Sequence, residues 1–88
     1  MIKAYSSNSD TKLSLAEIPA GKPARVLRIT SVGAIARRLM EMGVAPGAPV
    51  MVIKSAPLGD PLEVRVRGYH LALRRAEAQT IEVIKSND

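Results

Sequence analysis

The sequence contains no cysteine, tryptophan or phenylalanine, and it has only one histidine and two tyrosines among its 88 residues. Without cysteine, no disulfide framework, thiolate metal site or cysteine nucleophile can form, which fits a reducing compartment such as the cytoplasm. The shortage of aromatic rings argues against stacking platforms for single-stranded nucleic acid and against the aromatic grooves that bind proline-rich peptides. These absences exclude most catalytic chemistry and favour a binding or regulatory module.

Long apolar runs and catalytic motifs are also absent. The longest uncharged stretch, residues 42–53, is well short of the ~20 residues that a membrane-spanning helix needs. No apolar block follows Lys3, so a signal peptide is not expected. The chain has no glycine-rich phosphate loop, and no serine pairs with a histidine by any sequence argument. We therefore expect a cytoplasmic protein that does not insert into the membrane and is not an enzyme.

Positive charge and clear strand patterns are what the chain does have. Its net charge of +5 raises encounter rates with acidic partners, although ordinary solvated surface charge is an equal alternative. Residues 1–12 are polar and serine-rich, which predicts a mobile tail, and residues 86–88 form a short C-terminal tail. The pattern between them predicts one domain over residues 13–85.

The strand patterns predict a mainly β domain. Short strands are expected at residues 24–30, 50–55, 62–66, 69–73 and 80–85. Val50 to Ile53 is apolar on both faces, which is typical of a strand buried on two sides. Short helical turns are expected at residues 14–18, where Ser14 and Glu17 fit a capping box, and at residues 74–79. About five strands with one inserted helix describe a small SH3-like barrel.

The inserted helix is predicted by apolar residues at the i, i+4, i+7 spacing. Ile35, Leu39 and Met42 follow this spacing, and we expect all three to face the core. Ser31 is the expected N-terminal cap, and Gly43 stands where a left-handed residue would end the helix.

Three stretches of the chain resemble a known family, and they read LAEIPAG, RRLMEMGVAPG and VMVIKSAPLGDPLEVRVRGYHLALRR. They look like the FeoA family of small cytoplasmic proteins in bacterial ferrous iron transport. The resemblance covers residues 13–85 and is most specific at residues 39–47 and 56–61. It implies an SH3-like barrel that acts as an accessory to FeoB, a membrane permease with a cytoplasmic GTP-binding domain. Such a partner would place the protein peripherally at the inner membrane.

The loop at residues 57–61 is the first candidate site. Leu58 lies between a proline and a glycine at a loop tip, where an apolar side chain is hard to bury. Either it caps one end of the barrel, or it contacts a partner together with Pro57, Gly59 and Asp60. Met40, near the end of the helix, is a further candidate because a flexible thioether adapts to varied apolar surfaces.

A basic surface is the second candidate site. Arg65, Arg67, Arg74 and Arg75 could recognise acidic side chains or phosphates through their planar donor forks. The alternative is a solvated face that nearby glutamates partly neutralise.

Metal binding has little support from the sequence. No pair of histidines or cysteines occurs at ligand spacing, so no firmly bound cofactor is expected. His70 and Glu63 are the candidate ligands for a weak or adventitious divalent metal, and a plain surface histidine is the stronger alternative. Weak self-association into a homo-oligomer stays open. A metal-responsive regulatory domain and a basic nucleic-acid-binding barrel remain alternative functions, and the second is not favoured.

Overall fold

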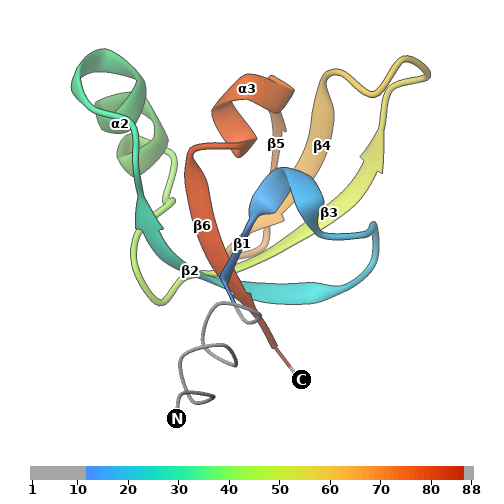
Figure 1. Cartoon of the computed structure of the whole chain (residues 1–88), viewed down its shortest axis with the longest axis horizontal. Helices are drawn as coiled ribbons and strands as arrows, with labels where there is room; N and C mark the ends of the chain where they lie inside the picture. The colour runs from blue at the N-terminus through green and yellow to red at the C-terminus, as the bar shows by residue number, and fades with distance from the viewer. Residues whose placement is uncertain (1–11, 87–88) are drawn as a thin grey trace, which may run out of the picture.

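The computed structural model describes residues 12–86, which form a six-stranded antiparallel sheet that curls around one core (Figure 1). The strands run in the order β1-β6-β2-β3-β4-β5. The strands are β1 (Lys12–Ser14), β2 (Pro23–Ile29), β3 (Pro49–Ser55), β4 (Leu62–Val66), β5 (Tyr69–Leu73) and β6 (Ile81–Lys85). The helical segments are the 3-10 turn η1 (Leu15–Glu17) and the helices α2 (Gly33–Glu41) and α3 (Arg75–Ala78). The expected tail residues 1–11 and 87–88 lie outside the described residues.

The mainly β fold with an inserted helix is confirmed, but the expected count of five strands missed β1. This strand has three residues, of which only Leu13 is apolar, so no alternation could reveal it. It forms because Leu13 pairs with Val83 at the centre of β6. The capping box predicted at Ser14 and Glu17 is confirmed for one of its hydrogen bonds, since the Ser14 amide donates to Glu17 Oε1 at 2.8 Å.

Alternation along β4 places one face of the strand in the core. Leu62, Val64 and Val66 are at most 2% exposed, whereas Arg65 on the opposite face is exposed. Leu73, which pairs with Leu62, is fully buried on the same inner face. Burying each such side chain contributes about 1.5–3 kcal/mol, so this pattern is a main source of stability.

The expectation that β3 is buried on both faces is wrong in part. Val50 and Val52 are buried, whereas Met51 and Ile53 are only half-buried. The outer face of the sheet is open here, and Met51 pairs with the exposed Arg65 of β4. A register shift after Val52 marks a bulge, which bends the strand as it crosses the barrel.

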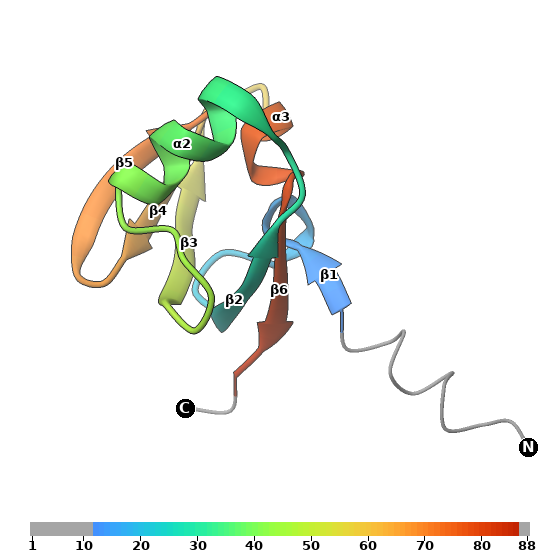
Figure 2. The ribbon, with the colours of Figure 1, turned by 90° about the vertical axis from the view of Figure 1, so that its left-hand side faces the viewer.

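The face of α2 that packs on the core is shorter than the apolar spacing predicted. Leu39 is fully buried and Met42 is half-buried against the core, but Ile35 is 45% exposed. The helix begins at Gly33 without a side-chain cap, because Ser31 instead donates its hydroxyl to Thr80 Oγ1 at 3.3 Å. Only the last turn of α2 therefore rests on the core, and its first turn projects beyond it (Figure 2).

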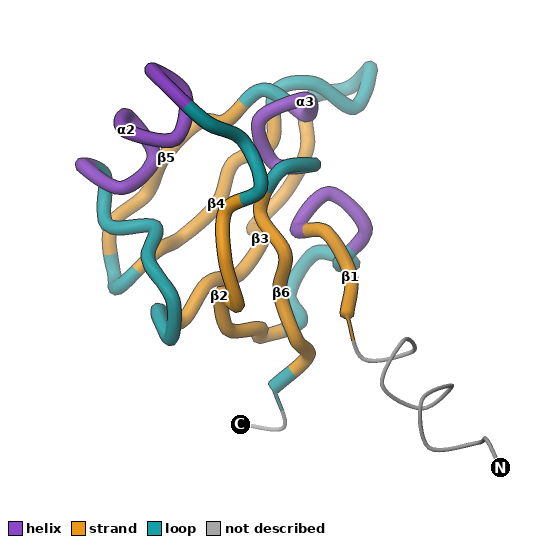
Figure 3. The backbone as a smooth tube through the Cα atoms, turned by 60° about the vertical axis from the view of Figure 1, so that its left-hand side comes forward, coloured by secondary structure: helices purple, strands orange, loops and turns teal. Residues whose placement is uncertain are grey.

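The helical segments gather at one end of the barrel (Figure 3). An ion pair between Arg38 and Glu77 joins α2 to α3, and Arg75 of α3 bonds to the Ala16 carbonyl in η1. The loop of residues 56–61 reaches the same end, which we call the helical end. At the end of α2, Gly43 has φ +100°, as the sequence predicted for a left-handed terminating residue.

Candidate functional site

The loop of residues 56–61 is built so that it displays one apolar side chain. Its own backbone closes it, because the Gly59 amide donates to the Ala56 carbonyl at 2.7 Å and the Ala56 amide donates to the Pro61 carbonyl at 3.0 Å. Leu58 at its tip is 96% exposed. The alternative that Leu58 caps the barrel is therefore wrong, and the leucine is free to contact a partner.

Arg75 holds this loop in place, which differs from the partner contact that the sequence suggested. Its Nε donates to the Gly59 carbonyl at 2.9 Å, and its Nη1 donates to the Ala16 carbonyl at 3.2 Å. Its backbone amide donates to Asp60 Oδ1 at 2.9 Å. The half-buried guanidinium thus joins the loop to η1, and we assign Arg75 a positioning role.

The strand register could have predicted that Arg75 clamps the loop, that is, holds it in place through hydrogen bonds. Residues 67 and 68 form the two-residue turn between β4 and β5, and Val66 pairs with Tyr69 while Leu62 pairs with Leu73. Extending this register by two residues brings Asp60 opposite Arg75. Charge alone groups Arg75 with the other arginines, whereas the strand register predicts its position opposite Asp60.

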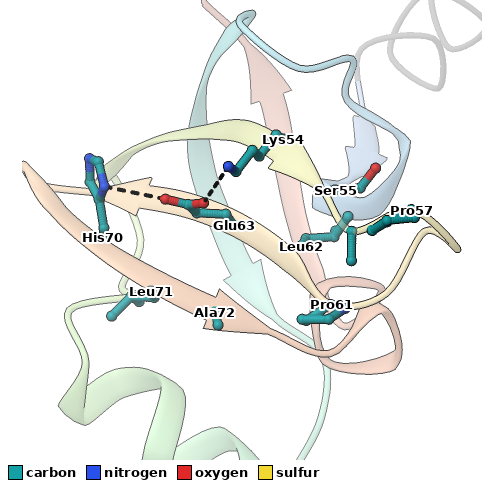
Figure 4. A pocket seen from close by; sticks show the side chains of 10 residues that line it. Lys54, Ser55, Pro57, Pro61, Leu62, Glu63, His70, Leu71 and Ala72 are labelled. Carbon is teal, nitrogen blue, oxygen red and sulfur yellow. Dashed lines mark ion pairs between the residues drawn. The ribbon is translucent and has the colours of Figure 1, made fainter.

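A groove of about 460 Å³ runs beside the loop along the outer face of β3, β4 and β5 (Figure 4). Two residues of the loop, Pro57 and Pro61, line one end of the groove. Glu63 lies toward the other end, between Lys54 and His70. The Glu63 carboxylate is 3.9 Å from Lys54 Nζ and 3.6 Å from His70 Nδ1. A partner that covers Leu58 could also enter this groove.

The structure brings His70 and Glu63 together, as a metal site at these residues requires. No third carboxylate, imidazole or thiol joins them, and no cluster of three such groups occurs anywhere in residues 12–86. Two donors leave at least half of a tetrahedral zinc shell to water or to another molecule. The pair can therefore offer weak coordination at most, and Lys54 competes for the same carboxylate.

The basic residues do not form one patch. Arg74 lies at the helical end, where it lines a shallow pocket with Asp60 and Glu77. Arg65 and Arg67 lie toward the opposite end of β4. At the usual rise per strand residue, Arg65 is roughly 10 Å and Arg67 roughly 17 Å from Leu62. Within residues 12–86, none of these three guanidinium groups forms an ion pair.

Met40 lies apart from the loop. Its side chain is 54% exposed on the last turn of α2. The end of this helix approaches the β4–β5 turn, where Arg67 Nε donates to the Gly43 carbonyl at 3.4 Å. The expected partner-binding residues are thus divided between the helical end and the β4–β5 turn. No helix within residues 12–86 is long and apolar enough to cross a membrane.

Comparisons with known proteins give a consistent result. The model of the FeoA domain family matches residues 13–85. The chain is 38% identical over 77 residues to an Fe(2+) transport protein A/Fe(2+) transporter FeoB fusion protein of Porphyromonas gingivalis, and the match covers 85% of this chain. The chain spans only 9% of the length of that curated relative.

Two solved structures share the architecture. The FeoA protein of Chlorobium tepidum is 42% identical with a TM-score of 0.80, and the match covers 86% of this chain and 73% of that one. Stenotrophomonas maltophilia FeoA complexed with zinc, described as a procaryotic SH3 domain protein, is 36% identical with a TM-score of 0.72. That match covers 81% of this chain and 88% of the other. The SH3-like fold expected from the sequence is confirmed.

Proposed function

Because this chain belongs to the FeoA domain family of non-catalytic iron-transport accessory proteins, we propose that it promotes ferrous iron uptake by docking on the FeoB permease. The P. gingivalis relative, whose name joins the two proteins as one fusion, supports a physical association between such domains and FeoB. Docking on the cytoplasmic part of the permease would hold this domain at the inner membrane without inserting into it.

The single observation that carries this proposal is Leu58, which is 96% exposed on a loop clamped by Arg75. Burying a leucine side chain on association contributes about 1.5–3 kcal/mol. A loop that is already ordered loses little entropy when it binds, so most of that gain appears as affinity. Pro57, Gly59 and Asp60 share the loop and form the rest of the proposed contact.

The remaining expected contacts take secondary roles in the proposal. Arg74 is exposed at the helical end beside Asp60 and contributes to encounter with an acidic surface, together with the net charge of +5. Arg65 and Arg67 lie farther along β4, and Met40 lies on α2, across the helical end from the loop (Figure 1), so these three residues do not share one small contact with Leu58. They belong to the proposed site only if the partner covers both ends of the barrel.

A weak divalent-metal contact at His70 and Glu63 is a lesser proposal. It rests on the 3.6 Å separation between His70 Nδ1 and Glu63 Oε2, and on the zinc complex of the S. maltophilia relative. Since two donors leave the coordination shell incomplete, we do not propose that the metal is a resident cofactor.

Affinity capture from detergent-solubilised membranes tests the docking. We expect the wild-type chain, immobilised through a C-terminal tag, to recover FeoB, and Leu58→Asp to recover at least tenfold less because a carboxylate cannot be buried in an apolar contact. Val32→Asp is the matched control, since Val32 is also an exposed apolar residue, at 85%, and lies at the start of α2 outside the loop of residues 56–61. Leu58→Asp should keep the wild-type melting temperature, and Val32→Asp should keep or raise it because Val32 is the N-cap residue of α2. Equal recovery of FeoB by both would remove Leu58 from the contact, and no recovery by the wild type would contradict the proposed function itself.

A further inference from the structure

A second groove, of about 360 Å³, lies on the outer face of β2, β3 and β4. It shares no lining residue with the groove beside Leu58. Pairing across the sheet builds it in two rows. One row runs from Pro23 through Met51 to Arg65, and the other runs from Arg25 through Pro49 to Arg67. We call it the arginine groove.

The arginine groove combines a cationic rim with an apolar floor. Its charged lining residues are all arginines, and no aspartate or glutamate of the described chain lines it. Arg65 and Arg67 form no ion pair within residues 12–86. Arg25 donates from Nη1 to the Gly47 carbonyl at 3.0 Å, which fixes its guanidinium beside the floor. Pro49 and Met51 supply apolar surface between the rims.

The backbone at Arg67 indicates that this arginine serves the groove and not the turn. Arg67 has φ +52° and Gly68 has φ +89°, the two left-handed residues of a hairpin turn that favours asparagine and glycine. A side chain as bulky as arginine is a poor choice for this conformation. Its guanidinium reaches the Gly43 carbonyl at 3.4 Å, a long bond that offsets little of that cost. Strained residues of this kind are concentrated at functional positions.

The chemistry of the groove selects one class of occupant. Guanidinium forks pair with carboxylates in a defined geometry, and the flexible thioether of Met51 adapts to an apolar side chain. A nucleic-acid strand would find no aromatic platform on this floor. A lipid surface would meet the rim arginines but could not fill a concave, apolar floor. An extended peptide that carries acidic residues around an apolar one satisfies both the rim and the floor.

We propose that the arginine groove is a docking site for an extended acidic segment of a partner protein, with carboxylates on Arg65 and Arg67 and an apolar side chain over Pro49 and Met51. The site is independent of the docking through Leu58, because the two surfaces are separate and either can bind without the other.

The test uses isotope-labelled full-length protein and three synthetic peptides, ELEELE, QLQQLQ and EGEEGE, titrated by NMR. We expect ELEELE to bind most tightly, because it alone supplies both charge and apolar surface, and to shift amides at Val50, Met51 and Gly68. Arg65→Gln and Arg67→Asn should each weaken binding about two- to fivefold, and added salt should weaken it further. Arg37→Gln is the control, since Arg37 is exposed on α2 outside the groove.

Arg67→Asn carries a second readout that separates a binding role from a structural one. Asparagine suits the left-handed position, so the variant should melt about 2–4 °C higher than the wild type while it binds ELEELE less well. The proposal is overturned if ELEELE does not bind, if Arg65→Gln and Arg67→Asn bind it as Arg37→Gln does, or if Arg67→Asn melts lower. Tighter binding of oligo(dT) or of phosphatidylglycerol vesicles at these amides would also overturn it, in favour of a nucleic acid or a lipid surface.

Discussion

Replacing Arg75 with alanine is expected to destabilise the fold, although the residue stands on the surface beside another arginine. The side chain donates two hydrogen bonds, to the Gly59 and Ala16 carbonyls, and these join the loop to η1. Both are lost in Arg75→Ala. The bond from the backbone amide to Asp60 remains, because every residue except proline keeps that donor.

The size of the effect follows from the charge and the exposure of the guanidinium. A hydrogen bond to a charged group contributes about 1.5–3 kcal/mol, and water replaces part of it when the group is half-buried. We expect Arg75→Ala to lower the free energy of unfolding by about 2 kcal/mol, which is about 8–15 °C in melting temperature for a domain of this size. Arg75→Lys keeps the charge but cannot reach both carbonyls, so it should lose about half as much.

Urea unfolding followed by circular dichroism measures this loss, with Arg74→Ala as the matched control. Arg74 is exposed and its side chain forms no ion pair within residues 12–86, so its removal should change stability by less than about 0.5 kcal/mol. Heteronuclear relaxation should also show faster motion at residues 57–60 in Arg75→Ala alone. Equal stability of the two alanine variants would refute the clamp, and with it the claim that Leu58 is displayed by an ordered loop.

Two further perturbations address the helix and the metal. Leu39 is the one fully buried side chain of α2, so Leu39→Ala should lower the free energy of unfolding by about 2–5 kcal/mol and remove hydrogen-exchange protection from residues 33–41. The exposed Ile35 is the control, and Ile35→Ala should lower the free energy of unfolding by less than about 1 kcal/mol. An equally small loss of stability in Leu39→Ala would show that other contacts hold the helix. Zinc titration followed by calorimetry should show weak binding to the wild type, and either His70→Ala or Glu63→Gln should abolish it. Asp60→Asn is the control and should bind zinc as the wild type does. Zinc binding that survives in both His70→Ala and Glu63→Gln would place the metal at other residues.

The strand β4 could be predicted because it alternates between one buried and one more exposed face. Leu62, Val64 and Val66 follow that rule without exception, and the β4–β5 pairing follows from the Arg67–Gly68 turn. The strand β1 could not be predicted in this way, since it owes its conformation to pairing with β6. Ile35 misled the prediction because the helical period says which residues share a face, but not how far along the helix the core extends.

The sequence predicted the exposed loop of the candidate site, but it did not predict which arginines lie beside that loop. The position of Leu58 between proline and glycine correctly indicated an exposed side chain. Similar charge, by contrast, grouped arginines that the fold separates, because Arg75 lies inside the loop contact and Arg65 lies along β4. Charge composition carries no information about register, and register decides which arginines are neighbours.

The central claim, that the protein promotes iron uptake by docking through Leu58, is tested most directly by the rate of ferrous iron uptake in anaerobic, iron-limited cells. The gene is deleted, and the wild type, Leu58→Asp or Val32→Asp is then expressed in the deletion strain at equal protein levels. Docking through Leu58 predicts that Val32→Asp restores uptake to the wild-type rate, while Leu58→Asp leaves it near the rate of the deletion strain. Full uptake with a folded Leu58→Asp protein, or no loss of uptake on deletion, would contradict the account.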